Sequence, residues 1–279
     1  MRHLKLQDFK ISVVIPTFNR SNFILRAIMS VLDQTYAPYE IIIIDDGSTD
    51  DTKAVVPSHP KIKYFYQDNA GVSAARNRGV LQASSQWIAF LDSDDEWIKS
   101  KLLLQVEYLK ENSSCQFLHT NESWFRNNIR VNKIKKHIKG GGNQFIPSLS
   151  QCLISPSTVL LKKDLFIDLG GFREDFEVCE DYDLWLKITS RFDIGYLSEE
   201  LIIKYAGHED QLSMKLPDMD FYRIQSLYDL FKQEHLSHDQ RSNIESIIKF
   251  KSERLRKGYM KHQRIDRLKI IDAIIDSLE

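Results

Sequence analysis

The sequence has few of the features that define several large classes of protein. Its 279 residues contain three cysteines, Cys115, Cys152 and Cys179, and their spacing matches no zinc site. An odd number of dispersed cysteines is typical of reduced thiols, so we expect a cytoplasmic protein. The longest purely aliphatic run, residues 41–44, is far too short to cross a bilayer. Residues 1–8 also lack the apolar core of a signal peptide.

The sequence also lacks a strong excess of charge of either sign. It has 38 Lys and Arg against 39 Asp and Glu, a net charge of −1, which argues against a nucleic-acid partner for the chain as a whole. No Gly-x-Gly-x-x-Gly follows the first predicted strand, so a dinucleotide-dependent dehydrogenase is not favoured. With 42% hydrophobic residues, the chain can bury one large core, with or without a small appendage.

Two apolar strands and a helix between them open the chain. Residues 11–15 form a β-rich run that Pro16 ends, and residues 40–44 form the next apolar run. Apolar positions from Ile24 to Leu32 recur with helical spacing. A strand, a helix and a strand within ~35 residues predict a right-handed βαβ unit with parallel strands. Ligands of such sheets bind beyond the carboxyl ends of the strands.

Acidic residues follow two of the predicted strands directly. Residues 40–44 lead into Asp45 and Asp46, and the apolar run 87–91 leads into Asp92-Ser93-Asp94-Asp95. The second cluster has two interpretations. Its residues could cap a helix predicted over residues 96–112, or Asp92 and Asp94 could hold Mg²⁺ or Mn²⁺ against a diphosphate. Capping does not require two clusters to share one sheet edge, so the shared edge favours the metal interpretation.

A helix predicted over residues 72–83 carries an arginine in an unfavourable place. It follows an edge-like strand, residues 62–66, and a turn at residues 69–71. Arg76 lies near the start of the helix, where its charge opposes the helix dipole. An anion or a carboxylate nearby would explain that cost, and a solvated surface arginine is the alternative.

Residues 123–163 contain no acidic residue, and they include eight Lys or Arg together with the glycines at 140–142. A basic, glycine-containing loop could cover a phosphate-bearing substrate, and a solvated hairpin is an equal alternative.

A second set of carboxylates opens a helix predicted over residues 179–188. Asp181 shares a helical face with Leu184, Trp185 and Ile188, the face expected to pack inward. We expect Asp183 to point outward and to pair with Lys187 at i, i+4. A carboxylate on the packed face is either a helix cap or a site residue.

The end of the chain is almost entirely helical in pattern. A closing strand is predicted over residues 201–205, and helices from residue 217 onward. Residues 249–269 carry nine Lys or Arg against two acidic residues. This segment could touch an anionic membrane surface, and a helix-packing element or a solvated helical face is the alternative.

Six short motifs occur in order along the first three quarters of the chain. They are Pro16-Thr17-Phe18-Asn19-Arg20, Asp45-Asp46-Gly47-Ser48-Thr49-Asp50, Asn69-Ala70-Gly71 with Ala75-Arg76-Asn77-x-Gly79, Asp92-Ser93-Asp94-Asp95, Gly170-Gly171-Phe172 and Glu180-Asp181-x-Asp183-Leu184-Trp185. Each motif is weak alone, but their order and spacing resemble the family 2 glycosyltransferases with the GT-A fold. The resemblance covers residues 11–213, and residues after 216 match nothing.

The resemblance implies a role for each matching donor-side residue. Pro16, Thr17, Phe18, Arg20 and Ser93 fall where the family binds the donor nucleotide.

Asp46 falls where a carboxylate accepts a hydrogen bond from the base, and Arg76 falls near the diphosphate or base. Asp92 would contact the ribose and Asp94 the metal, Mn²⁺ or Mg²⁺. His208 lies, in a looser match, where some relatives have a further ligand of the metal or diphosphate.

The resemblance also implies the reaction. Asp181 matches the catalytic base, with Glu180 and Trp185 on the acceptor side. The expected activity is an inverting, metal-assisted transfer of a sugar from a nucleotide sugar to a glycan or lipid-linked acceptor. We expect the nucleotide to be UDP, because UDP-sugars are common donors in the family.

The fold implied is a mostly parallel α/β sheet flanked by helices, with a catalytic domain at residues 1–215 and a helical extension at 216–279. A sugar-1-phosphate nucleotidyltransferase is one alternative, although a glycine-rich loop would then follow the first strand. A non-catalytic sugar-nucleotide or glycan-binding protein is the other, although Asp94 and Asp181 are both present. We expect the protein in the cytoplasm or at the inner face of the membrane.

Overall fold

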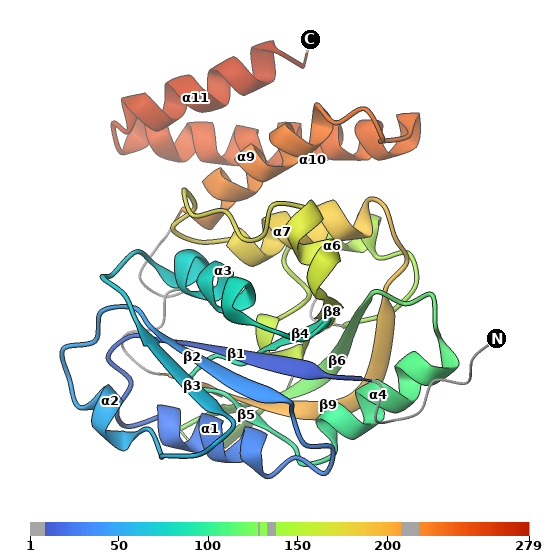
Figure 1. The fold of residues 1–279 in the computed structure, drawn as a ribbon. Coiled ribbons are helices and arrows are strands. Elements are labelled where there is room, and N and C mark those ends of the chain that lie inside the picture. Colours follow the sequence, from blue (N-terminus) through green and yellow to red (C-terminus); the bar gives the residue numbers. More distant parts are fainter. Residues whose placement is uncertain (1–8, 128, 133–137, 208–217, 279) are drawn as a thin grey trace.

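The computed structural model describes residues 9–127, 129–132, 138–207 and 218–278, and it shows a mixed α/β core with a group of helices packed on one side (Figure 1). Within these residues the core is built on a nine-stranded sheet, in the order β3-β2-β1-β4-β8-β6-β9-β5, with β7 paired to β6. Helices cover both faces of the sheet (Figure 1).

The first half of the sheet is parallel, as the βαβ pattern predicts. Its strands are β1 (Ile11–Thr17), β2 (Glu40–Asp45), β3 (Ile62–Tyr66) and β4 (Trp87–Phe90). β1 lies between β2 and β4, and β3 forms the edge next to β2, which confirms the predicted edge strand. All four strands therefore end at the same edge of the sheet.

The second half of the sheet mixes the two directions. Its strands are β5 (Glu96–Trp97), β6 (Phe117–Arg126), β7 (Ile129–Val131), β8 (Leu160–Lys162) and β9 (Gly195–Ala206). β8 runs antiparallel to both β4 and β6, whereas β9 is parallel to β6. The closing strand predicted over residues 201–205 is thus the end of a longer strand.

Alternating side chains of the sheet divide the core into two layers. Val13 and Ile15 of β1 pack against α1 (Ile24–Leu32) and α4 (Lys101–Glu111). Val14 faces the other way, toward α3 (Val72–Gln82), α6 (Lys163–Asp168) and α7 (Glu180–Thr189). A Cβ built on Gly79 of α3 would lie 2.3 Å from Val14 Cγ1, so this glycine lets the helix lie close to the sheet.

The remaining elements are three short turns of helix and the helices at the end of the chain. The short elements are α2 (Thr52–Val55), α5 (Phe145–Ser148) and the 3₁₀ turn η3 (Pro156–Thr158). The predicted C-terminal helices are α9 (Met219–Phe231), α10 (His238–Lys261) and α11 (Ile265–Asp276). They share one apolar cluster with α5 and α7, including Phe145 and Leu186.

One predicted helix is wrong at its start, and the error bears on the site. The helix predicted over residues 96–112 begins at Lys101, with Ser100 at its N-cap. Residues 96 and 97 instead form β5, which pairs with Ile202 and Ile203 of β9. Ser93, Asp94 and Asp95 therefore do not cap α4, and the capping interpretation of this acidic cluster is excluded.

Candidate active site

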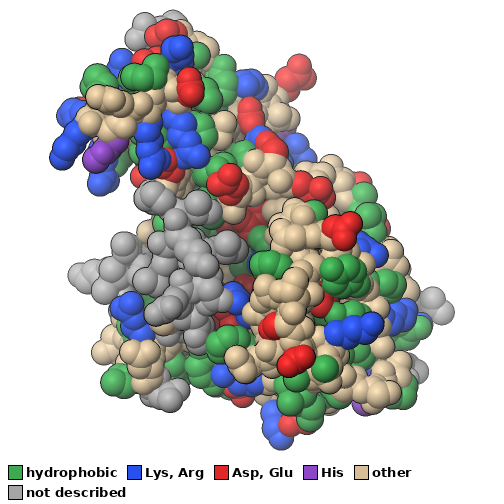
Figure 2. All heavy atoms as spheres, turned by 90° about the vertical axis from the view of Figure 1, so that its left-hand side faces the viewer, with side chains coloured by type: hydrophobic (Ala, Val, Ile, Leu, Met, Phe, Trp, Pro, Cys, Tyr) green, Lys and Arg blue, Asp and Glu red, His purple; other side chains and the backbone are tan. Residues whose placement is uncertain are grey.

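The predicted site residues converge at the carboxyl edge of the parallel strands. β1 ends in Thr17, β2 leads into Asp46, and β4 leads into Asp92, all at this edge. Figure 2 looks at the side of the molecule to which these strands lead, and acidic and basic side chains lie in a recess at its centre. The shared edge inferred from the sequence is therefore confirmed.

The loops after β1 and β2 hold each other in place. The Asn19 amide donates to Ser48 Oγ at 2.8 Å, and Asn19 Oδ1 accepts from the Thr49 amide at 2.8 Å. The Arg20 amide donates to Thr52 Oγ1 at 2.9 Å. These bonds fix the predicted nucleotide segment as one unit with the turn after Asp46.

Within that segment the side chains differ in accessibility. Pro16 is buried, and Thr17 is buried with no hydrogen-bond partner for its Oγ1 among the described residues. Phe18 has 45% of its surface exposed although its ring is apolar. An exposed ring beside a buried hydroxyl can receive the flat face of a base, so their nucleotide role stays a prediction.

Asp46 is buried, and its carboxylate is occupied within the protein. Oδ1 accepts from Gln67 Nε2 at 2.6 Å and from the Ala70 amide at 2.9 Å. Oδ2 accepts from the amide of Gly71, whose φ is 90°, at 2.8 Å. Asp46 therefore shapes the turn that starts α3, and its predicted contact with a base remains a prediction.

Arg76 is the centre of the site. Its side chain is buried, and Nη2 donates to Asp92 Oδ1 at 2.7 Å while Nη1 donates to Glu180 Oε1 at 2.6 Å. Burial works against its charge, but Asp92 and Glu180 raise the pKa of Arg76 further above its ordinary value. The interpretation of Arg76 as a solvated arginine is therefore wrong, and the carboxylates expected nearby are present.

Asp94 is the carboxylate of this cluster that has no ion-pair partner within 4.0 Å among the described residues. Its main-chain carbonyl accepts from Arg26 Nη2 at 2.7 Å, which fixes the turn from the α1 side. Burial and the neighbouring charge of Asp92 raise the pKa of Asp94. A divalent cation would relieve this repulsion, and carboxylate oxygens are the ligands that Mg²⁺ and Mn²⁺ prefer.

The described residues do not supply enough ligands to hold a metal ion by themselves. No group of three or more His, Cys, Asp and Glu side chains with ligand geometry occurs in the described part of the chain. Asp94 could therefore supply one ligand of a cation, and the other ligands would have to come from outside the described residues, such as a diphosphate and water. His208, the other predicted ligand, lies outside the described residues.

Asp95 belongs to the same acidic cluster, and the sequence suggested for it only the helix-capping role that the structure excludes. Its Oδ2 accepts from Ser157 Oγ at 2.6 Å and lies 3.7 Å from Lys204 Nζ. Burial raises the pKa of Asp95 to about 8; Lys204 opposes this shift and Asp94 reinforces it. Ser157 Oγ also accepts from the Asp92 amide at 3.1 Å, so it joins the two carboxylate positions.

Asp181 lies at the start of α7, half-buried, as the helical face predicts. Its Oδ1 accepts from the Tyr182 amide at 2.7 Å, and its Oδ2 accepts from the Cys152 thiol at 3.4 Å. Burial first, and then the charge of Asp181, hold the pKa of Cys152 well above its ordinary value. The thiol therefore remains a hydrogen-bond donor to the carboxylate.

The other α7 residues differ in part from expectation. Asp183 pairs with Lys187 at 2.6 Å as predicted, but the expectation that it points outward is wrong, because Asp183 is buried. Glu180 is held by Arg76, beside Asp181. Trp185 is 2% exposed and packs between Phe117 and Phe172, so the structure gives it a packing role below the site.

Two lysines in the second half of the chain, the buried Lys139 and the partly exposed Lys204, belong to an ionic network that sequence reasoning missed. Lys139 Nζ lies 3.0 Å from Glu122 Oε2. Burial opposes the ionised form of Glu122, yet Lys139 and Lys204 lower the pKa of Glu122 to about 2. One signal was present in the sequence, because Lys204 shares a strand face with the buried Ile202. Lys139 also shows that the basic stretch 123–163 is not simply a solvated surface.

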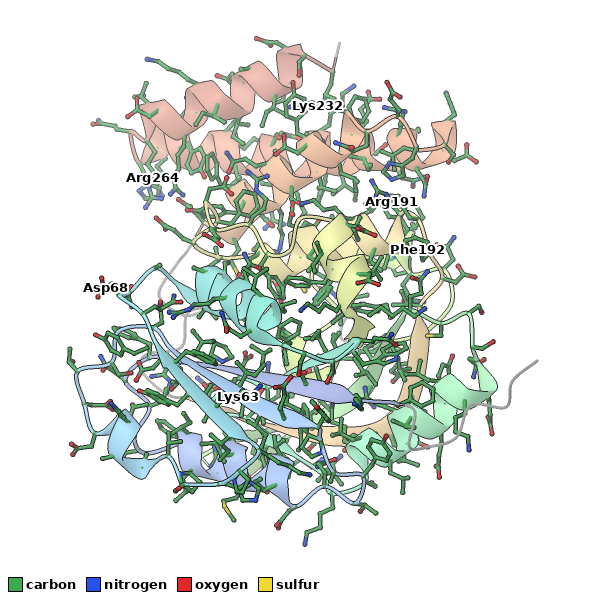
Figure 3. All side chains as sticks on the ribbon, in the orientation of Figure 1. Lys63, Asp68, Arg191, Phe192, Lys232 and Arg264 are labelled. Atoms are coloured by element: carbon green, nitrogen blue, oxygen red, sulfur yellow. The ribbon has the colours of Figure 1, made fainter. Side chains whose placement is uncertain are left out.

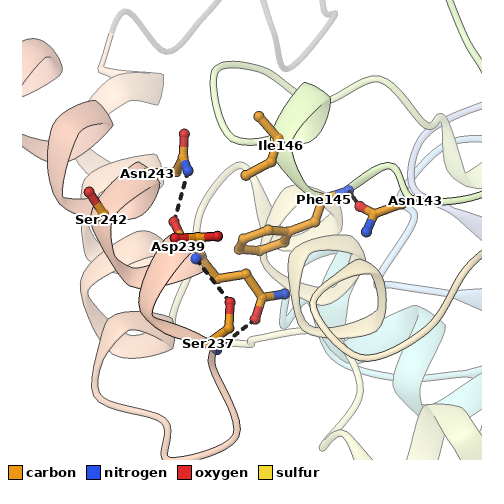
Figure 4. A pocket seen from close by; sticks show the side chains of 8 residues that line it. Asn143, Phe145, Ile146, Ser237, Asp239, Ser242 and Asn243 are labelled. Carbon is orange, nitrogen blue, oxygen red and sulfur yellow. Dashed lines mark hydrogen bonds between the residues drawn. The ribbon is translucent and has the colours of Figure 1, made fainter.

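A cavity of about 590 Å³ lies between α5 and the start of α10, away from every predicted site residue. Figure 4 shows that its polar side chains bond to their neighbours: Ser237 with Gln240, and Asn243 with the Asp239 carbonyl. These bonds belong to the N-terminal cap and the first turns of α10, so we assign no function to the cavity.

Comparison with known proteins gives the family to which this fold belongs. The profile of glycosyl transferase family 2 matches residues 12–170, and the chain belongs to this family. The glucosyltransferase WfgD of Escherichia coli, named as acting with UDP-Glc on α-D-GlcNAc-diphosphoundecaprenol, is 37% identical over 196 residues, which is 69% of this chain and 75% of WfgD.

Other relatives extend the comparison. The uncharacterized glycosyltransferase RC0461 of Rickettsia conorii is 40% identical over 201 residues, covering 70% of this chain and 33% of the relative. The chain therefore spans about a third of the length of some curated relatives. The crystal structure of residues 1–349 of S. aureus TarS in complex with UDP-GlcNAc shares the fold, with a TM-score of 0.67 and 20% identity over 90% of this chain and 73% of that one.

Proposed function

We propose that this chain transfers a sugar, with inversion, from a nucleoside diphosphate sugar to an acceptor hydroxyl in glycan biosynthesis. One observation carries the proposal. Arg76 joins Asp92, at the end of β4, to Glu180, at the start of α7, so the donor-side carboxylates and the neighbouring Asp181 belong to one site. The family, which is established, supplies the reaction class.

In this reaction Asp181 acts as the base. Its carboxylate is half-buried and held by the Tyr182 amide and the Cys152 thiol, so its orientation is fixed before an acceptor arrives. It accepts the proton of the acceptor hydroxyl as that oxygen attacks the anomeric carbon, and the nucleoside diphosphate leaves from the opposite face. A single displacement of this kind needs one base and inverts the configuration.

Asp94 provides the carboxylate that would hold Mn²⁺ or Mg²⁺ on the diphosphate side. When bound, the cation offsets the negative charge that develops on the leaving diphosphate. Arg26 fixes the main chain of Asp94, and Arg76 fixes Asp92 beside it. The protein thus keeps the two carboxylates in place against their mutual repulsion.

We propose UDP as the donor nucleotide and a lipid-linked glycan as the acceptor. WfgD is named for UDP-Glc and a diphosphoundecaprenol-linked acceptor, and TarS was crystallised with UDP-GlcNAc. A thermal-shift screen of UDP-, GDP-, dTDP- and CMP-sugars, each with and without Mn²⁺, tests the proposal. Stabilisation by a UDP-sugar only with Mn²⁺ supports it, and no stabilisation by any of the sugars contradicts it.

For such an acceptor we propose a peripheral contact with the inner face of the membrane through residues 249–269. Within residues 9–127, 129–132, 138–207 and 218–278, no helix has the length and hydropathy needed to cross a bilayer. In Figure 3 Arg264, in the turn between α10 and α11, lies on the same side as Asp68, just beyond the carboxyl end of β3. The basic turn and the site therefore share one side of the molecule.

Only part of this basic segment is free to bind lipid. Arg254, Lys261 and Lys269 are exposed and have no ion-pair partner among the described residues. The other six basic residues are paired within the protein, namely Lys249 with Glu245, Lys251 with Asp220, Arg256 with Asp272, Lys257 with Glu253, and Arg264 and Arg267 with Asp218. These pairs support the helix-packing interpretation for most of the segment.

A further inference from the structure

Lys204 is the one lysine of β9, and it approaches the acidic cluster at Asp95, whereas Arg76 contacts Asp92 and Glu180. Its neighbours in the chain, Ile202 and Ile203, pair with β5, the strand that directly follows Asp95. Its Nζ lies 3.7 Å from Asp95 Oδ2, and Ser157 connects Asp95 to the Asp92 amide. Lys204 therefore lies against the turn that carries Asp94.

The ammonium of Lys204 has hydrogen-bonding capacity that the described residues do not use. Nζ makes no hydrogen bond to them, and its contact with Asp95, at 3.7 Å, is longer than a close ion pair such as that of Lys63 with Glu40, at 2.6 Å. The side chain is 30% exposed. An ammonium has three donors, so a cation in this setting can still contact an incoming anion.

We infer that Lys204 binds the diphosphate of the donor, as the protein's own cation beside the carboxylate that would hold the metal. The inference rests on the proposed function, because it takes a nucleoside diphosphate as the ligand. Burial works against the charge of Lys204, but Asp95, Glu122, Asp92 and Asp94 raise the pKa of Lys204 above its ordinary value, so the ammonium stays charged when the anion arrives. The ammonium of Lys204 then offsets part of the negative charge of the bound diphosphate, in addition to the one proposed metal ion.

A simpler role is that Lys204 only neutralises Asp95. Removing Lys204 alone does not separate the two roles, because the remaining carboxylates could unfold the site. The double variant Asp95→Asn/Lys204→Gln removes both members of the pair together and retains groups of similar size. If neutralisation is the only role, this variant should melt near the wild-type temperature and bind UDP normally.

The test is titration calorimetry of UDP, UMP and uridine in the presence of Mn²⁺, on wild type and on the double variant. Lys63→Gln is the matched control, since Lys63 is a half-exposed, ion-paired strand lysine at the sheet edge (Figure 3). We expect the double variant to lose about 10- to 100-fold in UDP affinity, the range of one charge-assisted hydrogen bond. The loss should be smaller for UMP and absent for uridine, and Lys63→Gln should bind all three normally.

Two outcomes overturn the inference, and they are distinguishable. If wild type binds UDP but the folded double variant binds it equally well, Lys204 has only the neutralising role and the proposed function is untouched. If wild type itself binds neither UDP nor UMP with Mn²⁺, the proposed donor is wrong and the inference fails with it.

Discussion

Two aspartates of α7, two residues apart in the chain, have different surroundings and form a matched pair for mutation. Asp181 is half-buried, and its carboxylate faces Cys152 across 3.4 Å. Asp183 is buried and is neutralised by Lys187 at 2.6 Å. If Asp181 is the base and Asp183 a structural partner, asparagine should affect turnover at one position and stability at the other.

We predict that Asp181→Asn lowers the transfer rate by about 10²–10⁴-fold, the range of general-base contributions. Its melting temperature and donor affinity should stay near wild type, because asparagine keeps the shape and the capping ability of the residue. Asp183→Asn, the control, should lower the free energy of unfolding by ~1–3 kcal/mol and leave turnover nearly unchanged. Normal turnover in Asp181→Asn would show that this residue is only a helix cap.

Lys101 is a fully buried lysine outside the site. Its Nζ donates to Gln105 Oε1 at 2.9 Å and lies 3.9 Å from the centre of the Trp97 ring, and burial holds the pKa of Lys101 well below its ordinary value. Between this lowered pKa and the unfolded value of ~10.4, the unfolded chain binds one proton more than the folded one. Over that window the wild-type free energy of unfolding gains up to ~1.4 kcal/mol per pH unit from this group as pH rises.

We therefore predict that Lys101→Met is most favourable to stability at the low end of this window. Its free energy of unfolding relative to wild type should fall steadily as pH rises toward 10, because methionine has no proton to lose. Urea denaturation at several pH values between 6 and 10 measures the difference. A difference independent of pH would mean that Lys101 keeps its proton in the folded protein.

At the scale of elements, two glycines in helices should respond in opposite ways to alanine. A Cβ at Gly79 of α3 would lie 2.3 Å from Val14 Cγ1 and 3.3 Å from Ile44 Cγ1, whereas a Cβ at Gly258 of α10 has no atom within 4 Å. We predict that Gly79→Ala destabilises by ~1–3 kcal/mol through overpacking and that Gly258→Ala stabilises by up to ~1 kcal/mol. Thermal denaturation of both variants measures this. Equal effects would mean that α3 does not rest on the sheet through Gly79.

The sequence predicted the elements whose signals are local. Continuous apolar runs located β1, β2 and β4, and β3 was predicted to the residue. The shared carboxyl edge of these strands followed from the parallel direction of strands in a βαβ unit. The start of α4 was missed because pairing with β9, more than 100 residues away, makes β5 out of residues with helical spacing.

The contrast between local signals and long-range contacts also explains which site residues were predicted and which were missed. Asp92, Asp94 and Asp181 end or start regular elements and carry recognisable motifs. Ser157, Cys152 and Lys204 come from the second half of the sheet or its connections, and only tertiary packing brings them to those carboxylates.

Ser157, Cys152 and Lys204 contact carboxylates of the site and so influence its charge balance. The electrostatics of the site therefore could not be predicted from its sequence motifs alone. The inward position of Lys204 on a half-buried strand was the one local signal.

At the scale of the whole molecule, exposed side chains of the C-terminal helices allow the proposed membrane contact to be tested. Arg254, Lys261 and Lys269 are exposed, and Met260 and Ile265 near the α10–α11 turn are exposed apolar side chains. We predict that wild type co-sediments with vesicles containing anionic phosphatidylglycerol, and less so as salt rises.

The triple variant Arg254→Gln/Lys261→Gln/Lys269→Gln should lose this binding and keep its affinity for UDP. A control with three glutamines at exposed Lys53, Lys110 and Lys99 should still bind vesicles. If both triple variants bind alike, the charge of the whole surface rather than the C-terminal helices governs the contact.

The central claim is that Asp94 links a divalent cation to a nucleoside diphosphate at this sheet edge. Titration calorimetry of UDP into wild type and Asp94→Asn, each with and without Mn²⁺, tests it most directly. The account predicts binding to wild type that requires Mn²⁺ and a loss of that requirement and of most affinity in the variant, with an unchanged melting temperature. Undiminished Mn²⁺-dependent binding by Asp94→Asn would contradict the account.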